Sequence, residues 1–300
     1  MNKTKVRRLN DTSYLFYLFI CPWLIGLCFF VLFPMFFSLF TSFTDWNGTN
    51  RPSFIGFNNY KFIFTVDKLF QTSLKNTIFY VGFSLPLNLI ISIALAVLLN
   101  RRSKLFHLFR AIFYLPTICT GVASYITWLY LYNSDFGFIN LLLSKIAIRG
   151  PLWLSDTNTA MLSIIIMDMF VCGTSMTIVL ASLQEIPSMY YEVADLEGAN
   201  SLHKFFYITF PMISPVVFFN LLITLIKGLQ IFTQPYVMTE GGPANSTYVY
   251  GLHLYKTAFL YANFGYASSL AWVLFIFLLI VSGLIFASSR FWVFYEEKIK

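Results

Sequence analysis

The stretch from Ser13 to Thr44 contains no charged residue. It is longer than the apolar region of a cleavable signal, about 7 to 15 residues. It also exceeds the roughly 20 residues that an α-helix needs to cross a bilayer. The stretch therefore predicts a transmembrane helix that is retained in the mature protein. Pro22 and Pro34 within it are expected to kink the helix without breaking it, because neighbouring groups can satisfy the freed carbonyls.

Composition places the whole chain in the membrane. Of its 300 residues 58% are hydrophobic and 11% charged, whereas about a quarter of the residues in soluble domains are charged. A net charge of +7 is compatible with nucleic-acid binding, but a nucleic-acid binder clusters its Lys and Arg on one domain. Here they fall in short tracts between apolar runs. We therefore expect the chain to contact membrane lipid and to have no nucleic-acid partner.

Five further apolar segments alternate with polar, turn-rich ones. They predict spans at 77–99, 111–132, 160–183, 211–233 and 266–289. Residues 1–13 form an N-terminal tail, and residues 45–76 form a loop with a short amphipathic helix near Asn58 to Phe64. The predicted fold is an all-α integral membrane protein with six transmembrane helices.

The distribution of basic residues predicts the orientation. Six spans place both termini on the same side, and that side would carry 12 Lys and Arg residues against 7 on the other. Short loops rich in Lys and Arg stay in the cytoplasm. We therefore expect a multi-pass protein of the cell (plasma) membrane with both termini in the cytoplasm.

A polar stretch separates the fourth and fifth predicted spans. Pro187 interrupts the helix before it, and Ser188 can cap a new one. Gly198 stands where a left-handed residue would end that helix, and Asn200 or Ser201 can start the next. The pattern predicts two short helices joined by a sharp turn.

The first of these helices has an apolar face formed by Met189, Val193 and Leu196. The stretch carries four acidic residues against the single Lys204, whereas helices that lie on a membrane surface are usually basic. Its small residues would let another backbone approach closely. Docking to a protein is favoured over a loop lying on lipid.

These residues carry a resemblance to a known family. The run Tyr191-Glu192-Val193-Ala194, then Glu197-Gly198-Ala199, with Phe210-Pro211 behind, resembles the EAA loop of permease subunits in binding-protein-dependent ABC importers, the MetI-like transmembrane family. Two positions differ from the commonest form: Val193 replaces the first alanine, and Glu197 replaces an aspartate.

The resemblance implies an architecture and a role for the loop. It implies an ABC transporter transmembrane domain over residues 14–300, with a five-helix type I core at about 71–289 and one extra N-terminal helix. Residues 184–210 would form a cytoplasmic coupling hairpin that docks in a cleft of an ABC ATPase dimer. The implied coupling residues are Tyr191, Glu192, Ala194, Glu197, Gly198, Ala199 and Pro211.

Other segments resemble the carbohydrate-type permeases within this family. They are Phe54-Ile55-Gly56-Phe57-Asn58-Asn59-Tyr60, Thr239-Glu240-Gly241-Gly242-Pro243 and Phe264-Gly265-Tyr266-Ala267. The resemblance implies import of a sugar or oligosaccharide, delivered by an extracytoplasmic solute-binding protein, with a second, homologous permease as partner. Glycerol phosphate or another small solute remains an alternative.

The chain has no phosphate-binding loop of the Gly-x-x-x-x-Gly-Lys-Ser/Thr type. We therefore expect a transport subunit that is not an enzyme, with ATP hydrolysed by a separate subunit. No cofactor is expected, and no His, Cys or acidic cluster has the spacing of metal ligands. An autonomous secondary transporter is the less favoured alternative, because it would usually carry intramembrane charge pairs or inverted repeats.

Four polar residues in or next to predicted spans are the candidates for a solute pathway: Asp168, Lys227, Gln230 and Gln234. A carboxylate at mid-span costs about 3 kcal/mol, so Asp168 should face a cavity or serve as a hydrogen-bonded packing residue at a subunit interface. Lys227 either approaches the pathway or snorkels outward. The two glutamines either bind sugar hydroxyls or bridge helices.

Overall fold

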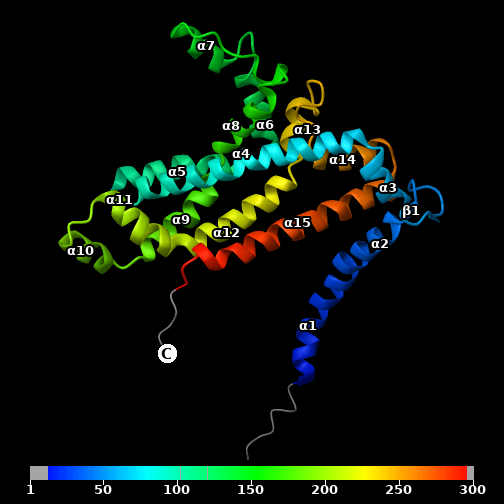
Figure 1. Cartoon of the computed structure of the whole chain (residues 1–300), viewed down its shortest axis with the longest axis horizontal. Coiled ribbons are helices and arrows are strands. Elements are labelled where there is room, and N and C mark those ends of the chain that lie inside the picture. Colours follow the sequence, from blue (N-terminus) through cyan, green and yellow to red (C-terminus); the bar gives the residue numbers. More distant parts are fainter. Residues whose placement is uncertain (1–12, 102, 120, 296–300) are drawn as a thin grey trace, which may run out of the picture. The chain divides into compact units, whose positions relative to one another are not determined.

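The computed structural model describes residues 13–101, 103–119 and 121–295, and most of them are helical (Figure 1). The strands among them, β1 (Thr44–Asp45) and β2 (Ser53–Phe54), have two residues each and pair antiparallel, with Thr44 opposite Phe54. The all-α prediction is confirmed. The predicted tail, residues 1–13, lies outside the described residues except for Ser13, where the first helix begins.

The helices form two compact units. The N-terminal unit comprises the described residues up to Thr65 together with 257–273, and the main unit comprises 66–256 and the described residues from 274 onward. In chain order the helices are α1 (Ser13–Leu27), η2 (Cys28–Leu32), α2 (Phe33–Ser42), α3 (Asn58–Thr65), α4 (Lys68–Leu99), α5 (Lys104–Ile118), α6 (Gly121–Leu131), α7 (Phe138–Lys145), η3 (Trp153–Ser155), α8 (Ala160–Met169), α9 (Gly173–Glu185), α10 (Ser188–Leu196), α11 (Ser201–Lys204), η4 (Phe205–Thr209), α12 (Phe210–Leu229), α13 (Thr233–Thr239), α14 (Tyr250–Tyr255), η5 (Lys256–Leu260) and α15 (Phe264–Trp292).

Within the described residues, four helical runs are long and apolar enough to cross a membrane: Phe16–Ser42, Lys68–Leu99, Ser201–Leu229 and Phe264–Trp292. Two bent pairs, α5 with α6 and α8 with α9, raise the number to as many as six. The six-span prediction agrees with this count. The third and fourth spans, which we expected as single helices, are instead each divided into two.

At the break between α8 and α9, bent by 40°, another helix packs closely. A Cβ built on Gly173, the first residue of α9, would lie 2.5 Å from the carbonyl oxygen of Phe113 and 2.9 Å from the Cα of Tyr114. Helix α5 therefore lies against the backbone at this break. Only glycine leaves room for such a close approach.

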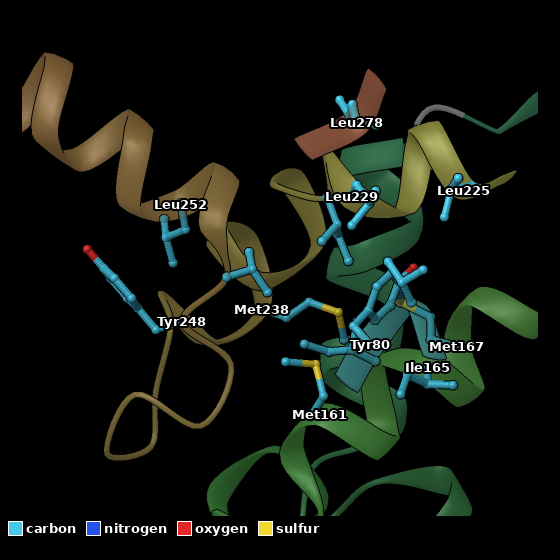
Figure 2. Packing of buried hydrophobic residues seen from close by; sticks show 14 of the residues in the cluster. Tyr80, Met161, Ile165, Met167, Leu225, Leu229, Met238, Tyr248, Leu252 and Leu278 are labelled. Carbon is cyan, nitrogen blue, oxygen red and sulfur yellow. The ribbon is translucent and has the colours of Figure 1, made fainter. Parts of the chain in front are cut away.

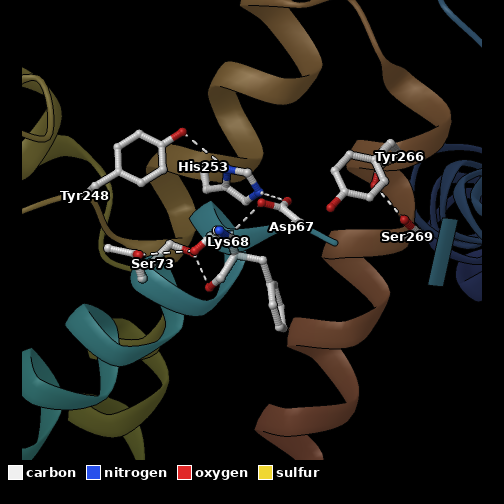
Figure 3. Close-up of polar contacts among 9 residues, drawn as sticks. Asp67, Lys68, Ser73, Tyr248, His253, Tyr266 and Ser269 are labelled. Atoms are coloured by element: carbon white, nitrogen blue, oxygen red, sulfur yellow. Dashed lines mark hydrogen bonds and ion pairs between the residues drawn. The ribbon is translucent and has the colours of Figure 1, made fainter. Parts of the chain in front are cut away.

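The second span begins at Lys68, earlier than the expected Thr77, because Asp67 caps it (Figure 3). The Oδ1 atom of Asp67 accepts the Phe70 N–H at 2.9 Å, and Oδ2 lies 2.9 Å from Nε2 of His253. The Tyr248 hydroxyl lies 3.2 Å from Nδ1 of the same imidazole. Burial lowers the pKa of His253 although Asp67 opposes the shift, so the imidazole is neutral at pH 7 and donates from Nε2. This buried contact ties the start of α4 to α14.

Two π-helical segments each come just before a proline near the start of an α-helix. Cys28–Leu32 precedes Pro34 in α2, and Phe205–Thr209 precedes Pro211 in α12. Proline lacks an N–H, and its ring clashes with the carbonyl four residues earlier in a regular helix. A wider turn at that place keeps both runs helical, so the second half of the predicted hairpin continues without interruption into the fifth span.

The main unit has two hydrophobic cores. One packs α4, α8, α12 and α13 together and includes Tyr80, Ile165, Leu229 and Met238 (Figure 2). The other joins α4, α9 and α12 through buried residues: Ala96, Leu99, Met176, Val179, Leu180, Leu183, Ile213 and Val217. Helices α4 and α12 contribute to both cores, and their remaining faces are free to line a cavity.

In the N-terminal unit, two of the segments that suggested the carbohydrate subgroup share a partner, the chain around Thr44. The Asn59 amide donates to the Ser42 carbonyl at 2.9 Å and to the Thr44 carbonyl at 3.0 Å. A Cβ on Gly265 would lie 2.2 Å from the same Thr44 oxygen. The short helix expected near Asn58 to Phe64 is confirmed as α3.

Candidate functional site

The hairpin formed by α10 and α11 is fixed mainly by its own residues. Gly198 has φ +75°, and a Cβ there would meet nothing within 4 Å, so the turn needs glycine for its backbone conformation and not for space. The side chain of Asn200 caps α11 by accepting the His203 N–H at 2.9 Å. Lys204 pairs with Asp195 across the turn. The predicted helix-turn-helix is therefore present.

One local prediction is wrong. Ser188 does not cap α10, because Pro187 occupies the N-cap position and no side chain caps the helix. Pro187 has φ −61° and ψ 134°, an extended conformation that makes Ser188 the first helical residue. At the base of the hairpin, the hydroxyls of Tyr191 and Thr209 lie 2.9 Å apart and tie α10 to η4.

The outward surface of the hairpin is apolar with an acidic flank. Met189, Val193 and Leu196 are 63%, 55% and 90% exposed, although they form the apolar face of an amphipathic helix. Glu192 and Glu197 are also exposed, and the predicted small residues are exposed or half-buried. Pro211 lies half-buried near the start of α12. Such a face on an otherwise well-fixed element is typical of an interaction surface.

The main unit also contains a cavity of about 510 Å³. Its walls come from α4, from both sides of the break between α8 and α9, and from α12 with the residues that follow it. All four predicted pathway residues line it: Asp168, Lys227, Gln230 and Gln234. The structure thus brings together side chains that lie on three separate elements.

Asp168 is held from two sides. The Tyr80 hydroxyl donates to Oδ2, and the Gln234 amide donates to Oδ1 at 3.4 Å. Both expectations for Asp168 are met in part, because it faces a cavity and is also hydrogen-bonded. Gln234 bridges α13 to α8, as one of its two interpretations proposed.

Lys227 and Gln230 project from the end of α12. Both are exposed and line the cavity, so Lys227 does not snorkel away from it. Between described residues the Lys204 ammonium pairs with Asp195, and the neutral His253 imidazole hydrogen-bonds Asp67; neither contact includes Lys227. The ammonium group therefore faces the cavity without a carboxylate partner among those residues.

Comparison with known proteins decides the family. No family model matches the chain. The probable ABC transporter permease protein YesP of Bacillus subtilis (strain 168) is 39% identical over 298 residues, which cover 98% of this chain and 96% of YesP. The chain belongs to the ABC transporter permeases. The lactose transport system permease protein LacF of Rhizobium radiobacter is 32% identical, covering 96% of this permease and 98% of LacF.

A solved structure shares the fold of this permease. A chain in the crystal structure of a bacterial alginate ABC transporter, in complex with an alginate pentasaccharide-bound periplasmic protein, aligns with a TM-score of 0.82 at 22% identity. The alignment covers 92% of the present chain and 94% of that chain. The agreement confirms the predicted architecture of an ABC importer permease.

Sequence reasoning missed several cavity residues of the permease. Asn220 is only 3% exposed, lines the cavity, and its Nδ2 has no hydrogen-bond partner among the described residues. It precedes Thr224 and Lys227 at i, i+4 and i+7, a polar stripe on an apolar helix that would have revealed a cavity face. Tyr80, Ser84 and Asn88 form the same kind of stripe on α4.

Proposed function

We propose that this permease passes a sugar or oligosaccharide through the membrane as one subunit of an ATP-driven ABC importer. The observation that carries the proposal is the cavity. Within an ABC transporter permease, a pocket of about 510 Å³ combines hydroxyl, amide and aromatic side chains in its lining. Sugars are recognised by neutral hydrogen-bonding groups and aromatic faces. The lactose transport assignment of the relative LacF supports this solute class.

The two charges at the cavity are compatible with a neutral solute. The carboxylate of Asp168 already accepts hydrogen bonds from Tyr80 and Gln234, which leaves it less free to bind a ligand. Lys227 is the group that would favour an anion such as glycerol phosphate. A neutral sugar needs neither charge for recognition, and it would meet mainly the neutral side chains of Asn88, Asn220 and Gln230.

Competition uptake in cells that express the whole importer tests this proposal. Unlabelled neutral sugars should compete with the transported solute, and a sugar phosphate should not. The Lys227→Gln variant should keep this preference and lose at most about threefold in rate, since one exposed charge without an ion pair to a described residue contributes little. Selective loss of sugar phosphate uptake in Lys227→Gln would show that the transported solute is anionic and not a neutral sugar.

The hairpin is proposed as the contact with a cytoplasmic ABC ATPase dimer, which supplies the energy that this non-enzymatic subunit lacks. Its exposed apolar face with an acidic flank supports a protein partner over lipid. Glu192→Lys should abolish uptake while the protein still inserts, because only the exposed flank changes. Normal uptake by Glu192→Lys at normal expression would rule out the hairpin as the contact with the ATPase. Asp135→Lys, at an exposed acidic position outside residues 184–210, serves as the control.

The remaining proposed partners are a second, homologous permease and an extracytoplasmic solute-binding protein. An alginate pentasaccharide-bound periplasmic protein accompanies the alginate transporter whose fold this permease shares, which supports the second of these partners. Co-purification of a tagged permease, expressed with its neighbouring genes, is expected to recover an ATPase and a second permease. A permease that transports its solute when expressed alone would contradict the importer assembly.

We also propose that both termini lie in the cytoplasm. The basic turn after α4 and the start of the hairpin line one pocket, as expected if both lie on the same side of the membrane. A reporter active only in the cytoplasm should work after Lys300 and within Arg101 to Lys104, and fail after Gly150. Activity after Gly150 would contradict the proposed topology.

A further inference from the structure

A third region of the main unit carries charged side chains that the proposed solute pathway does not use. A pocket of about 530 Å³ lies between the turn that follows α4 and the connection from α9 to α10. The turn contributes Arg101, the start of α5 contributes His107 and Arg110, and the opposite wall contributes Gln184, Ser188 and Tyr191. Among the described residues, no Asp or Glu lines this pocket.

The two arginines are fixed in place without being neutralised. Arg110 donates from Nε at 3.1 Å and from Nη2 at 2.6 Å to the carbonyl of Leu99, the last residue of α4. Arg101 lies over the Phe106 ring, 5.7 Å from its centre. Neither takes part in an ion pair between described residues. A guanidinium has five donors, so each arginine keeps several for a ligand.

The opposite wall adds donors of another kind. Helix α10 has nine residues and begins at Ser188 without a side-chain cap, so N–H groups of its first turn remain available beside the pocket. A helix start carries partial positive charge and binds phosphate readily. Two guanidinium groups facing an uncapped helix start favour an anion with several oxygens, because arginine pairs with such groups through two parallel hydrogen bonds.

We propose that this pocket binds a phosphate-bearing anion and thereby ties the turn after α4 to the first helix of the hairpin. The anion would bridge Arg101 and Arg110 on one wall and Ser188 on the other. The phosphate can come from an anionic phospholipid headgroup or from a free phosphate. The pocket lies at the end of an apolar span, beside the exposed apolar residues Leu105 and Leu108 of α5, where acyl chains would lie.

Native mass spectrometry of the full-length permease in detergent, with phosphatidylglycerol added, tests the proposal. Arg101→Gln should weaken lipid binding about tenfold, since a charge-assisted hydrogen bond is lost. Arg290→Gln is the matched control, because Arg290 is also exposed and lies over a neighbouring ring, that of Phe291, but does not line this pocket. Equal affinity in the two variants would overturn the proposal.

Two further measurements keep the outcome clear. Arg110→Gln risks unfolding because Arg110 caps α4, so Arg101→Lys is the second variant. Because it keeps the charge, Arg101→Lys should lose less lipid affinity than Arg101→Gln. Displacement of the lipid by millimolar inorganic phosphate would identify free phosphate as the ligand, and resistance to it would identify the headgroup. If adding the ATPase removes the lipid, and Arg101→Gln weakens ATPase binding equally, the pocket is a subunit contact and the proposal fails.

Discussion

The hairpin and the cavity use polar residues in opposite ways. In the hairpin, Asn200, Lys204 and Asp195 bond within the hairpin itself and fix its shape, while the apolar face of α10 stays exposed. In the cavity the helices are held by apolar cores, and polar groups such as the amide of Asn220 are left without partners among the described residues. We infer that the difference follows from the two proposed roles. A docking element is rigid before its partner binds, whereas a solute pathway keeps unpaired hydrogen-bonding groups that can bind the solute.

The largest effect is expected where the hairpin's shape depends on one backbone conformation. Gly198→Pro should reduce ATP-coupled uptake at least about twentyfold, because proline fixes φ near −65° and Gly198 has φ +75°. Gly198→Asn is the matched control: asparagine tolerates a left-handed conformation, and open space surrounds the position. Uptake is measured at equal membrane levels of each variant. Equal loss in both variants would mean that the site excludes side chains, which contradicts a purely conformational role.

The second-largest effect is expected at Asn220, which lines the cavity and whose buried Nδ2 atom has no hydrogen-bond partner among the described residues. A buried, unpaired amide costs stability, so Asn220→Leu should leave the melting temperature unchanged or raise it. If the amide binds solute, the same change should raise the KM for uptake about tenfold.

Leu225→Val provides the control for that experiment. Leu225 lies on the same helix and is buried, but it belongs to the core and does not line the cavity. The control should lower the melting temperature and leave KM unchanged. A lower melting temperature with unchanged KM in Asn220→Leu would show that Asn220 is a structural residue.

These two regions also differ in how far sequence could predict them. The hairpin is built from contacts between residues close in the chain, so Gly198 and Asn200 could be assigned from residue type and spacing. The error at Ser188 was also local, since a capping residue and a first helical residue differ by one position. The cavity depends on distant pairs, such as Tyr80 with Asp168. The sequence identified Asp168 as a charge that is costly in an apolar helix, but it did not indicate that Tyr80 is its hydrogen-bond partner.

A smaller effect is expected at Asp168, whose hydrogen bonds hold the cavity wall. Asp168→Asn should slow uptake at most about threefold and leave solute preference unchanged, because an amide oxygen can still accept from Tyr80. Tyr80→Phe should slow uptake more than Asp168→Asn does, since it leaves an oxygen of the Asp168 carboxylate without its hydrogen-bond donor. Uptake rates and competition profiles of the two variants provide the measurement. A changed preference in Asp168→Asn would make this carboxylate a solute-binding group.

The smallest effect is expected for the pair of Lys204 with Asp195, and it separates the internal contacts of the hairpin from its outward surface. The Asp195 side chain is 65% exposed, and exposed ion pairs contribute about 0.2 to 1 kcal/mol. Asp195→Asn should therefore lower uptake less than about twofold, because Gly198 and Asn200 still fix the turn. The charge-swapped variant, Asp195→Lys with Lys204→Asp, restores an internal pair but reverses the charge that Asp195 presents outward. If the pair only holds the hairpin together, the swapped variant should transport as well as the parent. A tenfold loss in the swapped variant, with normal uptake in Asp195→Asn, would show that the proposed ATPase partner recognises the sign of the charge at this position.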